Sequence, residues 1–438
     1  MENNGVESAL KVLEKQLNKP LITALEVCAR CGICAESCHY YVSEPSLKHV
    51  PAWRAEQLRK IYRKKYNLFA KLFPKIFGGK ELDEKTLEEL SEMAFSECTL
   101  CRRCTFNCPL GVDTPLIMKT LRAMAVAGGK APEMLTMLAD SAIEKGKNPE
   151  FFKELFLQQI KELEKELQKI VGDPDAKIPV GKKGARVLYV ALAGAHTIIP
   201  PAIIFYAVKE NWTLSLYEAA NYGVFLGDTE RAKLIAKRII DEAKELGVQE
   251  VVIAECGHAC AALVWEAPNW FKEKFPFRMR NIVELIAEYV EKGLLKLDKS
   301  KNPEPITYHD SCNLARTSGI FREPRIVLNA VAENFIEMNP HGIENYCCGG
   351  GGGLVALPEY EEKRLKAGKP KAEQIRRTGA KIVCAACENC RLQINDLNSN
   401  YNLNVKVVSL AELVVNAIVI DRKKKFKEER AEERVSLR

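Results

Sequence analysis

Residues 346–353 read YCCGGGGG, in which two adjacent cysteines are followed by five glycines. Adjacent cysteines do not easily form a disulfide with each other, and a run of glycines disfavours both helix and strand. The segment therefore predicts a loop that carries two thiols on backbone with almost no side chains. We expect Gly349 and Gly350 to let that backbone approach a bound metal or cofactor closely.

Three more cysteines form a pattern around this loop. Between Cys312 and Cys347 lie 34 residues, and another 34 lie between Gly349 and the pair Cys384 and Cys387. Each cysteine falls at the C-terminal end of an expected strand or just after it, and sites in open α/β sheets form at that edge. Five thiolates in one crevice exceed the four that a single cubane cluster uses. The pattern therefore predicts a larger or opened metal–sulfur centre.

The sequence around this pattern alternates short apolar runs with helical segments, as parallel α/β units do. The alternation starts near residue 185 and begins again near residue 303, which predicts an internal duplication of about 115 residues per copy. We expect residues 185–302 and 303–420 each to form a βαβαβ unit, with the two related by a pseudo-twofold axis. The expected strands are RVLYVALA, TLSLYEA and EVVIAE in the first copy and PITYHD, FIEMN and AKIVCA in the second.

Eight other cysteines lie within residues 1–127, in two runs with the spacing C-x2-C-x2-C-x3-C. This is the spacing of bacterial ferredoxins, in which the fourth cysteine of each run reaches the cluster of the other run. It predicts a helical ferredoxin-type domain with two cubane [4Fe–4S] clusters rather than a zinc site, which takes four ligands in C-x2-C pairs. We expect one cluster on Cys28, Cys31, Cys34 and Cys108, and the other on Cys98, Cys101, Cys104 and Cys38.

The remaining segments and the charge exclude some functions. Residues 128–184 predict a charged helical connector, and residues 421–438 a basic and charged tail. The basic segment 54–75 predicts either a solvated surface or a contact with anionic lipid or an acidic partner.

A net charge of +7 is too small to indicate a nucleic-acid partner. The N-terminus has no signal-peptide pattern, and Pro200 and Pro201 break the one apolar stretch that imitates a membrane span.

These motifs together resemble the cysteine-rich CCG domains of heterodisulfide reductases and their relatives. The chain is similar to the fused form, in which a ferredoxin domain precedes two CCG copies, and the resemblance covers nearly all of residues 20–420. It implies an oxidoreductase subunit that reduces or oxidises a disulfide or trisulfide at a non-cubane [4Fe–4S] cluster, fed by the two cubane clusters. The ligands that it implies for the non-cubane cluster are Cys312, Cys347, Cys348, Cys384 and Cys387.

The resemblance also implies partners and a location. Electrons would be exchanged with an integral membrane subunit of the cytochrome b or quinone-reactive type, and a small protein or a thiol would carry the disulfide. The chain itself is expected to be cytoplasmic and peripheral on the inner face of the cell membrane, attached through its partner subunits. Clustered thiols in a long chain without a signal peptide also indicate a reducing compartment.

The first copy departs from the family pattern. Ala195 stands at the expected first cysteine, and residues 221–223, Asn-Tyr-Gly, stand at the expected CCG. In the motif ECGHAC, Cys256 remains at the first position of the expected C-x2-C pair. Ala259 stands at the second position, and Cys260 follows one residue later. A second non-cubane cluster is therefore not expected. The retained motif is more similar to the catalytic subunit of the sulfite-reductase-linked membrane complex of sulfate reducers (the DsrK type), whose disulfide partner is a small protein with a cysteine-bearing tail.

Disulfide chemistry also needs protons and groups that face the substrate. His309, three residues before Cys312, and His258, in the remnant site, are the candidate proton donors, although a packing role is the alternative for each. Cys256 is either a redox or substrate-facing thiol or a small buried hydrophobe. Cys390 lies outside the five-cysteine pattern, and we expect it to be spare.

Two other functions are compatible with this architecture. One is an electron-relay subunit of a lactate, glycolate or glycerol-3-phosphate dehydrogenase complex, in which another chain holds the flavin. No G-x-G-x-x-G follows the strand RVLYVALA, and this absence fits both the relay and the reductase. The other is a scaffold whose third cluster does not turn over. The retained ECGHA motif favours the thiol–disulfide oxidoreductase.

Overall fold

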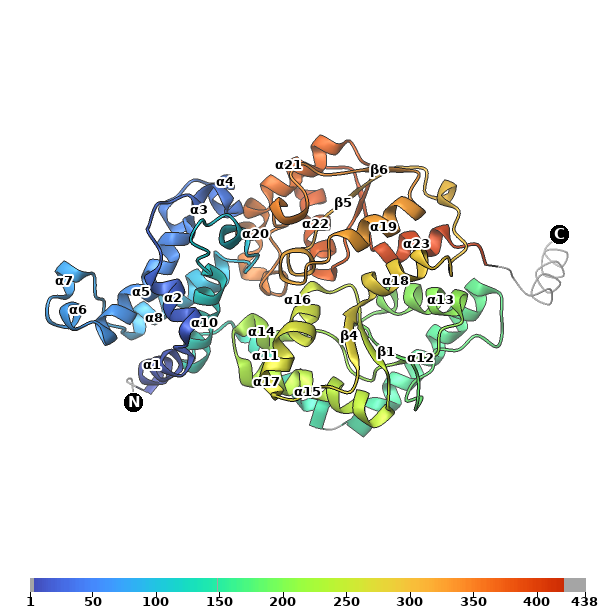
Figure 1. Ribbon diagram of the computed structural model, residues 1–438, viewed down its shortest axis with the longest axis horizontal. Helices are drawn as coiled ribbons and strands as arrows, with labels where there is room; N and C mark the ends of the chain where they lie inside the picture. Colours follow the sequence, from blue (N-terminus) through green and yellow to red (C-terminus); the bar gives the residue numbers. More distant parts are fainter. Residues whose placement is uncertain (1–3, 148, 421–438) are drawn as a thin grey trace.

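The computed structural model describes residues 4–147 and 149–420, so the predicted tail at 421–438 lies outside the described residues. A helical region at one end of the molecule lies beside two α/β halves, each built around its own sheet (Figure 1). The order along the chain is therefore the helical region, a helical connection, and then the two halves.

The helical region consists of short helices between and around the two cysteine runs. Asp83 and Asp113 accept hydrogen bonds from the backbone of Thr86 and Leu116, and so cap the two helices that follow them. The helices are α1 (Asn4–Gln16), α2 (Lys19–Glu26), α3 (Cys34–Ser37), α4 (His39–Ser43), α5 (Pro51–Tyr66), α6 (Leu68–Leu72), α7 (Pro74–Phe77), α8 (Glu84–Ser96), α9 (Arg103–Phe106) and α10 (Thr114–Ala127).

The connection that follows is helical as expected, but it is packed against the first half. It comprises α11 (Glu133–Lys147) and α12 (Pro149–Val171). On α11, Leu135 and Ala139 are buried in a cluster with Phe225. On α12, Leu163 and Leu167 are buried in the core that surrounds the first sheet. The helical spacing of these apolar residues places them on one face, so α12 forms a covering layer.

The first half contains a four-stranded parallel sheet with the order β2-β1-β3-β4. Its strands are β1 (Val187–Val190), β2 (Trp212–Leu214), β3 (Glu250–Ile253) and β4 (Arg278–Asn281). Its helices are α13 (Ile199–Val208), α14 (Tyr222–Leu226), α15 (Thr229–Leu246), α16 (Gly257–Cys260), α17 (Ala267–Phe271) and α18 (Ile282–Glu291). The apolar stretch with Pro200 and Pro201 becomes β1, a loop and α13, and no helix of the described residues is long and apolar enough to cross a membrane.

The second half contains a parallel sheet with the corresponding order β6-β5-β7-β8. Its strands are β5 (Pro305–Tyr308), β6 (Asn334–Ile336), β7 (Ile382–Cys384) and β8 (Lys406–Val408). Its helices are α19 (Arg322–Val331), α20 (Glu361–Ala367), α21 (Lys369–Thr378), α22 (Glu388–Tyr401) and α23 (Leu410–Ala417). Each half therefore has four strands where three were expected. The sequence pattern does not reveal β4 and β8 because they are short edge strands that carry charged residues.

The two halves share a continuous apolar core. Helix α13 of the first half packs on α23 of the second, and α18 packs on α19. Leu285 and Val327, for example, are both fully buried in the core between the sheets. The two halves therefore share a strand order and make reciprocal helix contacts, and the internal duplication with a pseudo-twofold axis stays a prediction. The helical region touches both halves, through α10 on α14 and α4 on α20.

Candidate metal centres

One group of thiols lies near the surface of the helical region. Burial raises the pKa of the Cys34 thiol, and the nearby thiols of Cys28, Cys108 and Cys31 raise it further, although a backbone hydrogen bond lowers it. The structure thus brings together the four cysteines expected to hold the first cubane cluster. Cys31 is exposed, and so are three apolar neighbours of the group, Val27, Ile33 and Leu110.

A second group of thiols lies at the boundary with the α/β halves, with Cys38 and Cys98 buried and Cys101 and Cys104 half-buried. Burial raises the pKa of the Cys104 thiol well above its usual value, and the charges of Cys101, Cys38 and Cys98 add to the effect. Cys38, from the first run, therefore lies with the second run, as the exchange of fourth ligands requires. The buried Arg54 donates from Nη2 to Cys38 Sγ at 3.1 Å.

A third group of thiols lies at the C-terminal ends of the strands of the second half. Cys348 Sγ is 3.6 Å from Cys390 Sγ, and the ligand atoms of His309, Cys348 and Cys390 all lie within 4.8 Å of one another. A hydrogen bond from Cys390 lowers the pKa of the Cys387 thiol to about 7. Arg316 donates from Nη2 to Cys312 Sγ at 3.0 Å. Cys390, expected to be spare, is therefore in the centre of this group.

The expected convergence of Cys384 with these thiols is not observed. Along the extended chain from β7, Val383, Ala385 and Cys387 pack into the cluster that contains Cys347 and Cys348. Cys384 and Ala386 face the opposite side and pack into the core between the two halves. Successive residues of a strand point to opposite faces, so two cysteines three residues apart on extended backbone cannot share a face. Burial raises the pKa of the Cys384 thiol well above its usual value, and the charge of Glu255 raises it further.

The pair that does share a face is Cys387 and Cys390. Cys387 precedes the first residue of α22, and the backbone N–H of Cys390 donates to its carbonyl at 3.0 Å. One helical turn brings residues i and i+3 to the same side. Cys256 holds the corresponding place before α16, so its partner position is Ala259. The five thiols that the structure gathers are Cys312, Cys347, Cys348, Cys387 and Cys390.

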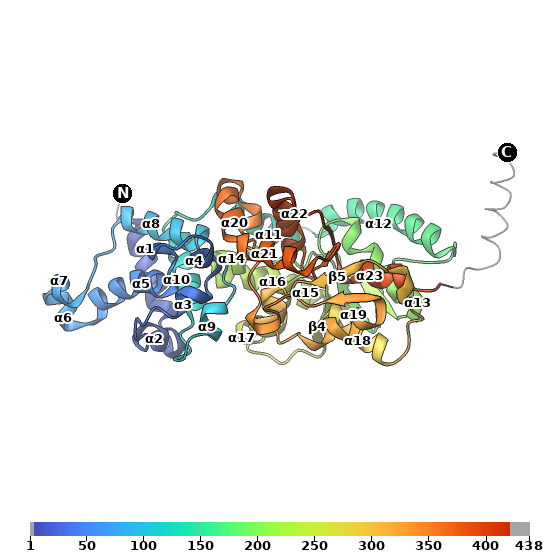
Figure 2. The same cartoon turned by 90° about the horizontal axis from the view of Figure 1, so that it is seen from above.

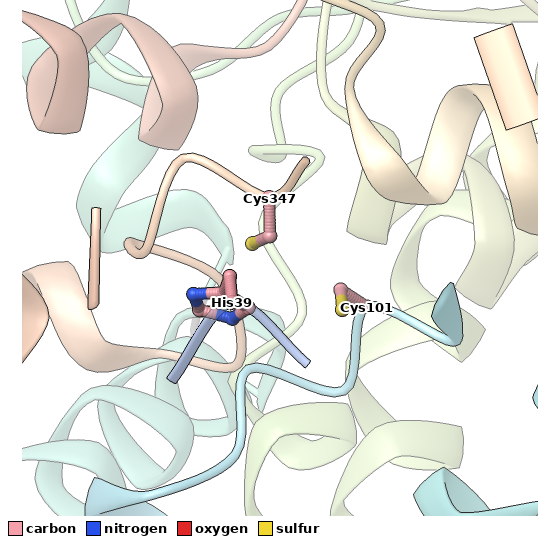
Figure 3. A group of neighbouring side chains, drawn as sticks. All are labelled: His39, Cys101 and Cys347. Atoms are coloured by element: carbon pink, nitrogen blue, oxygen red, sulfur yellow. The ribbon is translucent and has the colours of Figure 1, made fainter. Parts of the chain in front are cut away.

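The second and third groups of thiols are in direct contact. The ligand atoms of His39, Cys101 and Cys347 lie within 4.8 Å of one another, and Figure 3 shows them around one space. Hydrogen bonds from Cys312 and Cys347 lower the pKa of the Cys101 thiol. His39 Nδ1 donates to Ala367 O of α20 at 2.9 Å, since a carbonyl oxygen can only accept. The helical region is thus joined to the second half at this point.

The glycine run explains how the two groups come so close. A Cβ on Gly351 would lie 2.9 Å from Thr99 O, and a Cβ on Gly352 would lie 2.9 Å from Arg122 Nη2. Gly352 also has a φ of +67°, which side chains disfavour. Gly349 and Gly350, expected to approach a cofactor, pack instead against α20 and α22 of their own half. The glycines therefore permit close packing between protein segments.

Arg122 fixes this junction by donating to four backbone carbonyls. Its Nη1 donates to Phe225 O and Gly352 O, both at 2.7 Å, and its Nη2 donates to Cys98 O at 2.8 Å. Its Nε donates to Ala94 O at 3.0 Å. The side chain is fully buried. One guanidinium therefore connects the helical region with both α/β halves.

His309 is held in one orientation beside the third group. Lys371 Nζ donates to Asn345 Oδ1 at 2.5 Å, so the amide nitrogen of Asn345 faces His309 Nδ1 at 3.4 Å. In this assignment Nδ1 accepts and Nε2 carries the proton. Nε2 has no hydrogen-bond partner among the described residues, although it is buried. Burial and the charge of Lys371 lower the pKa of His309.

The corresponding place in the first half is filled by side chains. His258 Nδ1 is 3.1 Å from Cys256 Sγ, and its ring centroid is 4.3 Å from that of Phe225. The backbone N–H of Asn221 donates to His258 Nε2 at 3.4 Å. Burial lowers the pKa of His258 to about 3, so the ring is neutral. Cys260 lies apart from this contact and accepts from Ser318 Oγ at 3.7 Å.

Four buried side chains at these groups lie outside the cysteine motifs: His39, Arg54, Arg122 and Arg316. Arg316 donates to Cys101 O at 2.7 Å as well as to Cys312. The one local signal is its place four residues after Cys312. His39 and Arg122 contact residues that are distant in sequence, whereas Arg54 contacts Cys38 and His49, 16 and 5 residues away.

The donor sets fit iron–sulfur clusters. Arg54 Nε and Nη1, like His309 Nε2, are buried without a hydrogen-bond partner among the described residues. A buried N–H without a partner is costly, and an anionic sulfur-rich group would satisfy it. Thiolates are the ligands of such clusters. The second and third groups therefore combine the right donor atoms with unpaired N–H groups beside them.

Two family models match this chain, and together they cover all three groups of thiols. A model described as a 4Fe-4S dicluster domain matches residues 24–112, and one described as a cysteine-rich domain (CCG) matches residues 306–395. The first range contains both ferredoxin-like runs. The second contains Cys312, the double cysteine, Cys384, Cys387 and Cys390.

Curated relatives match almost the whole chain. The Hdr-like menaquinol oxidoreductase iron–sulfur subunit 2 of Archaeoglobus fulgidus is 30% identical over 95% of this chain and 83% of the relative. One subunit of the dihydromethanophenazine:CoB–CoM heterodisulfide reductase of Methanosarcina mazei is 26% identical over 93% of this chain and 98% of the relative. The EtfAB:quinone oxidoreductase of Syntrophomonas wolfei is 24% identical over 90% of this chain and 58% of the relative.

Proposed function

The chain belongs to the family of Hdr-like iron–sulfur subunits, and on that premise we propose that it is the catalytic subunit of a membrane-associated electron-transfer complex. In this proposal it interconverts a disulfide or trisulfide and the corresponding thiols at a non-cubane [4Fe–4S] cluster. The observation that carries the proposal is the gathering of five thiols in one cluster, two of which, Cys348 and Cys390, lie within 4.8 Å of a ring nitrogen of His309. A site that served only for electron relay would need four thiols and no proton donor.

Each group of thiols has a separate part in the proposal. Cys28, Cys31, Cys34 and Cys108 would hold one cubane cluster, and Cys38, Cys98, Cys101 and Cys104 the other. Cys312, Cys347, Cys348, Cys387 and Cys390 would hold the non-cubane cluster. When bound, the clusters would supply one-electron transfer. At the five-thiol site they would also supply iron that can bind sulfur in the interval between the first and the second electron transfer. The contact of Cys101 with Cys347 supports electron transfer between the last two groups.

Cleavage of one disulfide takes two electrons and two protons and releases two thiols. His309 is positioned to hold a proton at Nε2, because Asn345 occupies its other ring nitrogen and Lys371 orients Asn345. His258 is already paired with Cys256, and that contact supports a packing role for it. Burial raises the pKa of the Cys256 thiol, and the nearby charge of Cys387 raises it further. A raised pKa disfavours the thiolate, so only the closeness of Cys256 to Cys387 supports a thiol that faces the substrate there.

The exposed end of the helical region suits an electron partner. Cys31 is exposed there among Val27, Ile33 and Leu110, whereas the other two groups are mostly buried. Exposed apolar residues gathered around a redox site are the kind of surface that protein partners cover. The name of the menaquinol oxidoreductase relative supports a quinol-reactive partner. In this proposal the partner is an integral membrane subunit of the quinone-reactive or cytochrome b type, and the chain lies on the cytoplasmic face of the membrane through it.

A relay function for a flavoprotein-linked complex is the second candidate. It is favoured by the match to the EtfAB:quinone oxidoreductase, of which this chain covers 58%. Such a relay would keep the clusters but would bind no disulfide. The five-thiol site and its unpaired histidine favour the first candidate.

Iron analysis and electron paramagnetic resonance of protein purified without oxygen test the proposal. We expect about twelve irons per chain and a paramagnetic signal that appears on oxidation with an added thiol and is absent in Cys347→Ser. About eight irons, with signals from reduced cubane clusters alone, would contradict the reductase. Twelve irons with no response to thiol or disulfide would favour the relay.

A further inference from the structure

Residues 66–80 form an apolar tip at the end of the helical region. In Figures 1 and 2, α6 and α7 project beyond α5 on the side away from both α/β halves. The exposed fractions of Ile76, Leu68 and Phe69 are 77%, 66% and 58%. The other exposed large apolar side chains here are Tyr66, Leu72, Phe73 and Phe77. Apolar surface gathered in this way on a protein marks a binding site or a membrane contact.

The tip is an ordered structure with its apolar side chains turned outward. Asn67 Oδ1 caps α6 by accepting from Ala70 N at 3.0 Å. Where the chain returns, Lys80 N donates to Lys60 O at 3.1 Å. The rings of Phe69 and Phe77 lie 5.4 Å apart across the corner between the two helices. The backbone therefore fixes the apolar residues at the surface.

The charged residues within the tip are all positive, although the exposed Glu81 follows the tip directly. Residues 61–80 contain no aspartate or glutamate, and they carry three consecutive basic residues at 63–65 and three lysines within the tip. Each basic residue at 63–65 already forms an ion pair with a glutamate of the helical region. Lys71, Lys75 and Lys80 are exposed and take part in no ion pair within the described part of the chain. Lys71 and Lys75 are therefore available to an anionic partner, and Lys80 is so in part, since its charge also acts on Asp83.

We propose that the apolar tip inserts into the headgroup region of a negatively charged lipid bilayer. The phenylalanine, leucine and isoleucine side chains would enter the boundary of the acyl chains, and Lys71, Lys75 and Lys80 would lie at the lipid phosphates. Apolar burial and attraction to anionic lipid are the two contributions that hold interfacial helices. A bilayer accepts a convex projection such as this without a matching groove, whereas a protein partner would need one.

The position of the tip connects this contact with electron transfer. Helix α5 ends at the tip, and its other end begins with Pro51 and Ala52, beside the first group of thiols. A helix of 16 residues is about 24 Å long. The tip would thus hold the exposed thiol group within about that distance of the bilayer surface. The inference concerns the chain's own contact with lipid and does not depend on the disulfide chemistry.

Vesicle co-flotation of the oxygen-free, full-length protein tests the inference. The probes are vesicles of phosphatidylcholine alone and of phosphatidylcholine with about one third phosphatidylglycerol. We expect binding to the anionic vesicles that weakens as salt rises. The double variant Phe69→Asp/Ile76→Asp should weaken it about tenfold or more, and so should Lys71→Glu/Lys75→Glu.

A matched control is Leu234→Asp/Leu294→Asp, which changes two exposed leucines of the first half and should leave vesicle binding within about twofold. Iron content measured on each variant separates a lost lipid contact from a lost cluster. Equal vesicle binding by the tip variants and the wild type would overturn the inference. So would an absence of vesicle binding together with loss of a membrane partner in the tip variants, because the tip would then be a protein-docking surface.

Discussion

The two α/β halves have the same strand order, yet their strand ends are occupied differently. In the second half, the loop after β6 and the start of α22 carry the thiols of Cys347, Cys348, Cys387 and Cys390. In the first half, the corresponding segments carry Asn221, Tyr222 and Gly223, and then Cys256 and Ala259. His258 and Phe225 pack together there with Asn221.

This difference shows that the fold does not depend on the thiols. The first half keeps its sheet and its apolar core although one thiol remains at the place of the pair. Its neutral, buried His258 and its aromatic residues fill space that is lined by sulfur in the second half. The thiols of the second half are therefore a functional addition to a scaffold that is stabilised by apolar burial.

The largest effect should come from removing a thiol of the third group. Cys390→Ser should lose about four irons per chain, because Cys390 lies with Cys348 and His309 at the five-thiol site. Cys384→Ser and Cys256→Ser should keep their iron, since Cys384 faces the core between the halves and Cys256 belongs to the first half. Iron and sulfide analysis of oxygen-free preparations provides the measurement.

The outcome for Cys384 would sharpen the comparison between the halves. If Cys384→Ser lost the irons and Cys390→Ser kept them, Cys384 would be the ligand, and the chain after β7 would have to adopt a different register. Circular dichroism of each variant would show whether the fold was retained.

A smaller effect should follow from removing the guanidinium that connects the halves. Arg122→Met leaves buried carbonyls of Phe225, in the first half, and Gly352, in the second, without a donor. We expect the free energy of unfolding to fall by about 3–5 kcal/mol. Calorimetry or denaturant unfolding would measure this loss. Arg377→Met, at an exposed arginine of α21, is the control and should change it by less than about 0.5 kcal/mol.

If Arg122→Met had the stability of the wild type, the contact between the halves and the helical region would be held mainly by apolar packing. The stability of each half would then not depend on the hydrogen bonds of Arg122.

The smallest of the three effects concerns one carboxyl group of the first half. Glu242 is buried, accepts from Ser215 Oγ, and accepts from Leu216 N at 2.9 Å. Burial raises its pKa from 4.5 to about 7. Between those two pH values the folded state holds a proton that the unfolded state has lost, so stability falls as the pH rises through this window. The full loss, reached above pH 7, is about 3 kcal/mol.

Glu242→Gln should remove this dependence, and its free energy of unfolding should therefore fall less between about pH 5 and pH 8 than that of the wild type. Urea unfolding at both pH values is the measurement. Glu245→Gln, exposed on the same helix, should retain the slope of the wild type. Parallel slopes for Glu242→Gln and the wild type would mean that this carboxyl ionises normally in the folded protein.

Much of the site follows from cysteine spacing, because cluster ligands come from short motifs and their number reflects the type of cluster. The two runs in the helical region, the double cysteine and Cys312 could all be identified in this way. The choice between Cys384 and Cys390 could not. In CAACENC both pairs have the spacing C-x2-C, and only the point where extended backbone becomes α22 shows which thiols share a face.

The composition and the order of apolar and polar residues were sufficient to predict a helical ferredoxin-type region followed by two parallel α/β halves. Local patterns specify local structure, since hydrophobic periodicity follows the geometry of a helix or a strand. The edge strands β4 and β8, the packing of α12 and the outward face of the tip depended on what each segment contacts. Arg122, Arg316 and the glycines of YCCGGGGG have their partners in distant parts of the chain, and such contacts exist only once the tertiary structure has brought those parts together.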